Sequence, residues 1–116
     1  VIGLGGNHTF INNENLGCAF LITENGVIAG YLILTYVFSF EYGGRIGFLD
    51  ELFVADAFRG RGLGRAGVTF TQQYATKSGL KLLYLEIEPH NGRARDLYLN
   101  AGFTAHKRAL LQYKIT

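Results

Sequence analysis

The spacing of apolar residues changes near residue 55, and this change constrains the fold more than any other feature of the chain. Before it, apolar runs over 17–23, 27–40 and 45–54 are separated by Asn25-Gly26 and by Gly43-Gly44. Asn-Gly between apolar runs is a strong hairpin signal. The first half therefore predicts an antiparallel meander of strands.

After residue 55 the apolar residues follow a helical period. One face of a helix that ends near Gly79 would carry Leu63, Ala66, Gly67, Phe70 and Tyr74. The segment Lys81–Glu88 then alternates like a strand and is closed by Pro89. A strand, helix and strand in succession predict one parallel pairing with a right-handed crossover.

A second helix follows, for which Asn91 is a suitable N-cap and Gly102 a suitable C-terminal stop. Phe103–His106 and Leu110–Ile115 read as a closing pair of strands. The predicted fold class is α+β, with a mixed, mostly antiparallel central sheet flanked by helices. The length of 116 residues fits a single domain.

Composition excludes several classes of protein. With 48% hydrophobic and 17% charged residues the chain is not disordered, and a net charge of +2 does not indicate a nucleic-acid partner. No apolar run reaches the roughly 20 residues of a membrane span, so we expect no membrane segment.

The single cysteine and the scattered histidines limit the kinds of site that the chain can form. Cys18, the only cysteine, forms no intrachain disulfide and reads as a small buried residue, which fits a reducing, cytoplasmic location. His8, His90 and His106 lack ligand spacing, so we expect no metal site.

A glycine-rich basic turn links the strand pattern before residue 55 to the helical pattern after it. Its sequence is Arg59-Gly60-Arg61-Gly62-Leu63-Gly64-Arg65. Glycines let backbone N–H groups approach a ligand, and a following helix start adds positive charge. Arginine side chains add bidentate donors. The turn therefore suits a phosphate or pyrophosphate, although a flexible basic turn without a ligand is the plain alternative.

Part of this turn also matches a dinucleotide-binding pattern. Gly62 to Gly67 reads G-x-G-x-x-G, and Glu86 follows at the end of the next strand. Those glycines should follow their strand almost directly, whereas residues 55–61 intervene here, and the chain is short for two mononucleotide-binding halves. A nicotinamide dinucleotide protein is therefore the less favoured alternative.

Residues 49–103 resemble the cofactor-binding half of a GNAT-type N-acetyltransferase. The turn fits the family's R/Q-x-x-G-x-G/A, and its lead-in Leu52 to Phe58 looks like L-x-V-x-P-x-x with Ala57 near the proline position. Asn91 to Phe103 matches every fixed position of N-x-x-A-x-x-L-Y-x-x-x-G-F. The resemblance divides the domain into an irregular start (1–16), antiparallel strands (17–54), an acetyl-CoA-binding core (55–103) and closing strands (104–116).

The resemblance also implies roles for residues. Arg59 to Arg65 would hold the pyrophosphate of acetyl-CoA, Leu52 and Val54 would pair their backbone with the pantetheine arm, and Asn91 would bind the same arm. Tyr98 would protonate the leaving thiolate, and the acceptor would be an amine on a small molecule or peptide. A non-catalytic coenzyme A-binding module is the main alternative.

The general base is less defined than the acid. Glu51 is the first candidate and Asp50 the second, because strand alternation puts them on opposite faces and only one can face the acceptor. A solvated carboxylate at a strand end is an equally good reading of either residue.

The front of the chain departs from the family pattern. A GNAT domain usually begins with another strand and two helices, whereas only about 16 irregular residues precede the first clear strand. We expect a truncated or trimmed variant. The strand left at the front of the sheet would be an exposed edge, which favours a homodimer or an exchanged strand.

Overall fold

Three long strands form the antiparallel meander expected from the sequence. The structure is a computed structural model that describes residues 2–3 and 14–115. Strands β2 (Gly17–Glu24), β3 (Val27–Ser39) and β4 (Gly44–Val54) pair in order. Asn25 and Gly26 connect β2 to β3 with φ angles of 52° and 79°, as a hairpin turn of the predicted kind requires.

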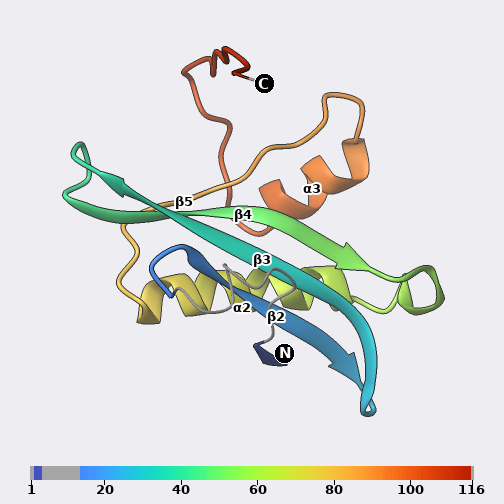
Figure 1. The fold of residues 1–116 in the computed structure, drawn as a ribbon. Coiled ribbons are helices and arrows are strands. Elements are labelled where there is room, and N and C mark those ends of the chain that lie inside the picture. The colour runs from blue at the N-terminus through green and yellow to red at the C-terminus, as the bar shows by residue number, and fades with distance from the viewer. Residues whose placement is uncertain (1, 4–13, 116) are drawn as a thin grey trace.

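The crossover after β4 produces the predicted parallel pairing. A short 3₁₀ helix, η1 (Asp56–Phe58), precedes α2 (Leu63–Lys77), and β5 (Leu83–Tyr84) then pairs parallel to β4. With β1 (Ile2–Gly3) antiparallel to β2, the sheet order is β1-β2-β3-β4-β5 (Figure 1). The predicted α+β fold class is confirmed.

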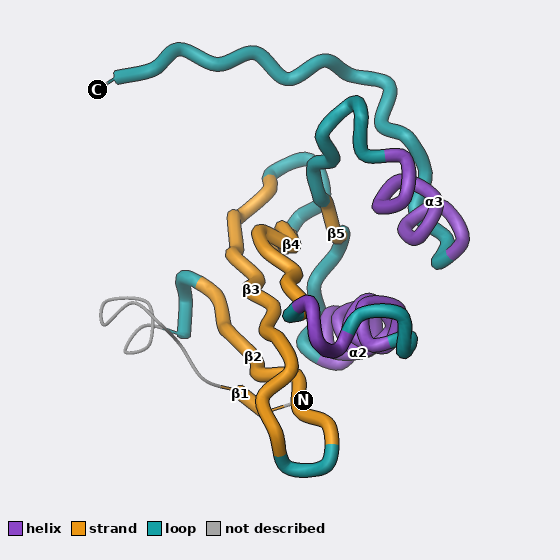
Figure 2. The backbone as a smooth tube through the Cα atoms, turned by 90° about the vertical axis from the view of Figure 1, so that its right-hand side faces the viewer, coloured by secondary structure: helices purple, strands orange, loops and turns teal. Residues whose placement is uncertain are grey.

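One face of the sheet packs against α2 (Figure 2). Leu32, Leu34 and Leu49 form the buried centre of this contact. Phe20 of β2 meets Phe70 of α2 edge to face, with ring centroids 4.8 Å apart. The apolar helix face that the sequence predicts is therefore the face that covers the sheet.

A bulge in β4 changes the predicted orientation of its two acidic residues. Leu34 pairs with Leu49 and Ile33 pairs with Glu51, so Asp50 is an extra residue on β4. Leu49 and Leu52 both pack with the core, while Asp50 and Glu51 between them are exposed. The expectation that alternation puts Asp50 and Glu51 on opposite faces is wrong, because the bulge interrupts the alternation.

The C-terminal part differs from the prediction in its strands. Helix α3 (Gly92–Asn100) follows the Asn91 cap as expected, but the strand predicted over Lys81–Glu88 is limited to the two residues of β5. Neither Phe103–His106 nor Leu110–Ile115 forms a strand, so the closing strands predicted within 104–116 are wrong for the described residues up to 115. A strand needs a partner, and these segments lie along none.

The N-terminal residues are described only in part. Ile2–Gly3 pair with β2, although irregular structure was predicted over 1–16, and residues 4–13 lie outside the described residues. None of the helices in the described part of the chain is long and apolar enough to cross a membrane.

Candidate functional site

The glycine-rich turn leads into α2 with an open helix N-terminus. Gly60 and Gly62 have φ angles of 80° and 79°, and Gly62 is the N-cap without a side-chain hydrogen bond. The first turn holds Arg65 and no acidic residue. The N–H groups at the start of a helix have no intrahelical acceptor, so this turn presents donors and positive charge to an anion.

Two of the three arginines of the turn form ion pairs with other side chains of the chain. Arg59 donates from Nε to the Val54 carbonyl at 3.0 Å and pairs with Asp56 at 2.9 Å. Arg61 pairs with Glu24 at the end of β2, at 2.8 Å. All four side chains keep some exposure to solvent, and such ion pairs contribute little to stability. An anion bound at the turn can therefore compete for both guanidinium groups.

Among residues 2–3 and 14–115, no strand pairs with the outer edge of the second half of β4, which lies beside this turn. Strand β4 is paired with β5 only as far as Phe48. Ala55 donates its N–H to the Ala29 carbonyl at 2.7 Å, on the β3 side. Because peptide groups alternate in direction along a strand, the N–H groups of Leu52 and Val54 point to the opposite, unpaired side. This edge can accept an extended ligand as an added strand would be accepted.

Helix α3 lies next to the start of α2. A Cβ built on Gly64 would lie 3.8 Å from Leu97, so the first turn of α2 packs closely on α3. Asn91 caps α3, because its Oδ1 accepts the Ala94 N–H at 3.1 Å. The cap occupies the carbonyl oxygen of Asn91, which leaves its amide NH₂ for a ligand.

Tyr98 of α3 is half-buried and packs edge to face on Phe103, with ring centroids 5.7 Å apart. Burial raises the pKa of the Tyr98 phenol above its ordinary value, so the group keeps its proton at neutral pH. Among the described residues, nothing forms a hydrogen bond with its hydroxyl group. Tyr98 is thus a proton donor without an acceptor in the described part of the chain.

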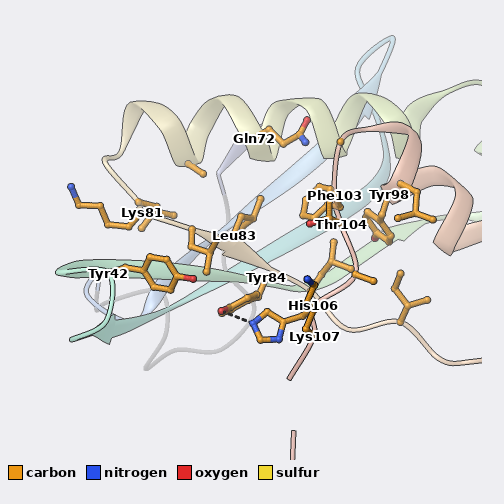
Figure 3. Close-up of a pocket in the computed structure, with 18 of the residues that line it drawn as sticks. Tyr42, Gln72, Lys81, Leu83, Tyr84, Tyr98, Phe103, Thr104, His106 and Lys107 are labelled. Atoms are coloured by element: carbon orange, nitrogen blue, oxygen red, sulfur yellow. Dashed lines mark hydrogen bonds between the residues drawn. The ribbon is translucent and has the colours of Figure 1, made fainter. Parts of the chain in front are cut away.

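A cavity of about 890 Å³ lies on the β5 side of α3 (Figure 3). Its lining comes from the C-terminal half of α2, from 80–87, from α3 and from 102–108. Of the predicted site residues, Tyr98 alone is among those that line it. The cavity is therefore a separate feature from the glycine-rich turn and the free edge of β4.

Glu51 lies on the face of the sheet that points away from α2. The Tyr31 hydroxyl donates to Glu51 Oε1 at 2.9 Å, and this hydrogen bond is the main reason that the pKa of Tyr31 is raised. Tyr31 also lies against Phe53, with ring centroids 5.5 Å apart. Leu32 and Leu52, which alternate with these residues, face α2, so Glu51 faces away from it.

The structure gathers most, but not all, of the predicted site. The turn, the edge of β4 and α3 adjoin one another, whereas Glu51 and Tyr98 lie on different sides of β4 and do not contact each other. Tyr31 was missed by the sequence analysis; in the register of β3 and β4 it pairs with Phe53, two residues along β4 from Glu51. Cys18, half-buried, lies 3.3 Å from the Tyr36 hydroxyl and outside this site.

The histidines take no part in the site as far as it is described. His90 is exposed, and His106 lies 3.4 Å from the Tyr84 hydroxyl, while His8 lies outside the described residues. Within residues 2–3 and 14–115, no three His, Cys, Asp or Glu side chains cluster as metal ligands would.

Comparison with known proteins identifies the family. The model of the acetyltransferase (GNAT) family matches residues 5–103, and the chain therefore belongs to that family. A curated relative, the uncharacterized N-acetyltransferase YhfO of Bacillus subtilis (strain 168), is 37% identical over 91 residues. That match covers 78% of this chain but 61% of YhfO, so the chain spans less than two thirds of this relative.

Solved structures share the fold. An integron cassette protein, HFX_CASS3, from the mobile metagenome of Cole Harbour Salt Marsh is 34% identical to this chain, with a TM-score of 0.82. The match covers 93% of this chain and 66% of the HFX_CASS3 chain. The aminoglycoside acetyltransferase meta-AAC0020 from an uncultured soil metagenomic sample, in complex with sisomicin, is 18% identical with a TM-score of 0.80, covering 93% of this chain and 70% of its own. These likenesses confirm the GNAT-like fold.

Proposed function

We propose that this chain binds acetyl-CoA along the free edge of β4 and transfers the acetyl group directly to an amine. The observation that carries the proposal is the adjacency of an uncapped, arginine-bearing helix N-terminus and an unpaired strand edge. A pyrophosphate suits the first and a pantetheine arm, with its amide groups, suits the second. Arg59 to Arg65, Leu52, Val54 and Asn91 are the residues assigned to this binding.

Acetyl-CoA supplies an activated acetyl group whose sulfur leaves as a thiolate. A thiolate accepts a proton readily, since a free thiol has a pKa of about 8.5. Tyr98 holds a phenolic proton for it, because its raised pKa keeps the hydroxyl group protonated at neutral pH. The Val54 N–H, on the unpaired side of β4, is assigned to the oxygen that becomes negatively charged.

The acceptor amine must be unprotonated to attack. An alkyl ammonium group has a pKa of about 10.4, so a base is needed at neutral pH. Glu51 is assigned to this role, with Asp50 as the alternative, and a water molecule carries the proton from the amine. In the balanced step a C–N bond forms and the C–S bond breaks. The amine gives its proton through water to Glu51, and Tyr98 gives its proton to the leaving thiolate.

The acceptor is assigned only as an amine of a small molecule or peptide. The similar structures include an aminoglycoside acetyltransferase and a ribosomal-protein-alanine N-acetyltransferase from Brucella melitensis biovar Abortus 2308, so the acceptors in their names differ widely. The sheet face that carries Tyr31, Glu51 and Phe53, which α2 does not cover, is the side from which we infer the acceptor approaches.

Calorimetry with acetyl-CoA tests the binding part of the proposal. The parent should bind with a micromolar Kd, and Arg59→Ala combined with Gly62→Glu should abolish binding, because a carboxylate and a Cβ then stand where the pyrophosphate is assigned. A well-folded parent that does not bind acetyl-CoA would refute the cofactor site.

A coenzyme A-binding module without catalysis is the second candidate. It is favoured by the separation of Glu51 and Tyr98 on different sides of β4. Release of coenzyme A with a panel of amines distinguishes the two, since the enzyme should lose this activity in Tyr98→Phe while the binding module never shows it.

A further inference from the structure

Helix α3 has few means of its own to keep its position in the fold. It has nine residues, Gly92–Asn100, and none of them is fully buried. An isolated helix of this length is only marginally stable in water, because starting a helix costs more free energy than so few residues return. The position of α3, and with it the position of Tyr98, therefore depends on contacts with other elements.

One of these contacts is a hydrogen bond from α2. The Gln72 amide donates from Nε2 to the carbonyl oxygen of Ala101, the C-cap of α3, at 2.8 Å. Carbonyl groups at the end of a helix lack an intrahelical donor, so Gln72 supplies a donor that the helix itself cannot. Within residues 2–3 and 14–115, this is the one hydrogen bond that joins α3 or its caps to α2.

The capped carbonyl group is closely connected to Tyr98. The Tyr98 carbonyl accepts hydrogen bonds from the N–H groups of Ala101 and Phe103, at 3.1 and 3.0 Å. The Phe103 ring also packs edge to face on the Tyr98 ring. Tyr98 thus moves together with residues 101–103, so a donor that fixes the Ala101 carbonyl also limits where the Tyr98 hydroxyl can lie.

The second contact between the two helices is apolar and does not fix their register. Leu97 lies over Gly64 of α2, which has no side chain to interlock with it. A hydrogen bond, in contrast, needs its donor within about 3 Å and in line with the acceptor. Gln72 and Tyr98 line the same cavity, one from α2 and the other from α3 (Figure 3). The bond from Gln72 is therefore the contact that sets the position of α3 along α2.

We propose that Gln72 is a positioning residue, which holds the Tyr98 hydroxyl in place by capping α3 from α2. The inference rests on the proposed function, in which Tyr98 gives its proton to the leaving thiolate. Helix α2 begins at Leu63, in the turn assigned to the pyrophosphate, and Gln72 lies about 14 Å further along the same helix axis. A single helix thus sets the separation between the pyrophosphate and the proton donor, at the two ends of the pantetheine arm.

Steady-state kinetics with matched variants tests the effect on catalysis. Gln72→Leu keeps a side chain of similar size but removes the donor. It should lower kcat about tenfold, because a small displacement of a reacting group costs on that scale. The Kd for acetyl-CoA should stay unchanged, since no group assigned to binding is altered. Gln73, the next residue on α2, is exposed, and the control Gln73→Leu should keep the kcat of the parent.

A double-mutant cycle with Tyr98→Phe separates positioning from a general loss of packing. If Gln72 acts through the Tyr98 hydroxyl, its replacement has nothing left to disturb once that hydroxyl is removed. In the Tyr98→Phe background, Gln72→Leu should therefore lower kcat by no more than about twofold. A tenfold loss in both backgrounds would overturn the proposal, because Gln72 would then act independently of Tyr98.

NMR tests the positioning without acetyl transfer, so its result does not depend on the proposed function. Tyrosine labelled with ¹³C at the ring carbon that carries the hydroxyl gives one signal for Tyr98, identified by its absence from Tyr98→Phe. This signal should shift or broaden in Gln72→Leu and stay as in the parent in Gln73→Leu. Gln72→Glu, which has the same length but no NH₂ donor, should behave like Gln72→Leu.

The remaining signals of the same spectra show that each variant is folded. An unchanged Tyr98 signal in both Gln72 variants, or an equal change in Gln73→Leu, would contradict the positioning role. A parent that acetylates no amine would refute the proposed function instead, and the ¹³C comparison would still decide whether Gln72 holds Tyr98.

Discussion

The hydroxyl group of Tyr31 donates a hydrogen bond to Oε1 of Glu51 over 2.9 Å, and this bond joins β3 to β4 on the sheet face that α2 does not cover. It occupies one carboxylate oxygen and leaves the other for water or for an acceptor. Asp50, the bulged neighbour, has no such partner among the described side chains. The pair therefore distinguishes the two candidate bases.

Replacing Glu51 by glutamine should reduce kcat for amine acetylation by about 100-fold or more, because a positioned base contributes on that scale. Asp50→Asn is the matched control and should change kcat only a few-fold. Steady-state kinetics with an amine found in the acceptor screen measures both. A large loss in Asp50→Asn with little change in Glu51→Gln would instead assign the base to Asp50.

Gly62 and Gly79 allow backbone strain to be separated from ligand binding. Their φ angles are 79° and 74°, and a Cβ on either would meet nothing within 4 Å. Alanine at each position should therefore lower the free energy of unfolding by about 1–2 kcal/mol.

Only Gly62→Ala should also weaken acetyl-CoA binding, since Gly62 begins the helix that is assigned to the pyrophosphate and Gly79 follows the other end of that helix. Urea unfolding and calorimetry on both variants check this. Equal loss of affinity in the two variants would argue against a pyrophosphate site at this turn.

Gly67 sets the distance between α2 and β4. A Cβ at this position would lie 3.0 Å from Leu52 and 3.4 Å from Ile22, in the buried contact of helix and sheet. Gly67→Ala should lower the free energy of unfolding by about 1–3 kcal/mol, despite the better helix propensity of alanine, because the core is overpacked.

Gly92→Ala is the control for Gly67→Ala, since Gly92 also lies in a helix but a Cβ there meets nothing within 4 Å. This change should leave stability equal or higher. Chemical denaturation of both variants provides the comparison. If Gly67→Ala were as stable as the parent, the close approach of α2 to Leu52 would not be needed for packing.

Local signals in the sequence predicted the parts of the fold that depend on local chemistry. The Asn25-Gly26 turn, the periodic face of α2 and the Asn91 cap each follow from a few neighbouring residues. The parallel pairing of β4 and β5 followed from a chirality rule and not from any side chain.

What failed depended on contacts between distant segments. The alternation in 103–115 indicates strands, but a strand forms only where an edge accepts it, and this chain leads that segment away. The bulge at Asp50 left one signal that alternation alone overlooked, namely two core leucines three residues apart, Leu49 and Leu52. The ion pair of Arg61 with Glu24 joins residues that no local pattern relates.

Alkaline pH should destabilise the fold through two tyrosines. Burial raises the pKa of Tyr98, and burial with hydrogen bonds to Cys18 and Tyr74 raises that of Tyr36. Unfolded phenols titrate near pH 10, so above about pH 10 the unfolded chain releases protons that the folded chain keeps. The stability that these groups contribute is present below that pH and is lost as the pH rises.

Urea unfolding between about pH 8 and pH 11 should therefore show a free energy of unfolding that falls above about pH 10. Tyr36→Phe should show a shallower fall, because one of the two groups is removed. A parent whose stability stays constant to pH 11 would mean that both phenols titrate as freely in the folded state as in the unfolded one.

Asn91 has two assigned roles that two substitutions can separate. Its Oδ1 caps α3, and its amide NH₂ is assigned to the pantetheine arm. Asn91→Ala removes both groups and should cost about 1 kcal/mol of stability as well as affinity for acetyl-CoA. Asn91→Asp keeps an oxygen that caps equally well but removes the NH₂ donor.

The aspartate variant should therefore unfold at the same urea concentration as the parent while its Kd for acetyl-CoA rises several-fold. Equilibrium unfolding and calorimetry on the same samples measure the two effects independently. An aspartate variant that binds as tightly as the parent would limit Asn91 to its capping role, and the contact with the cofactor arm would then have to come from the edge of β4 alone.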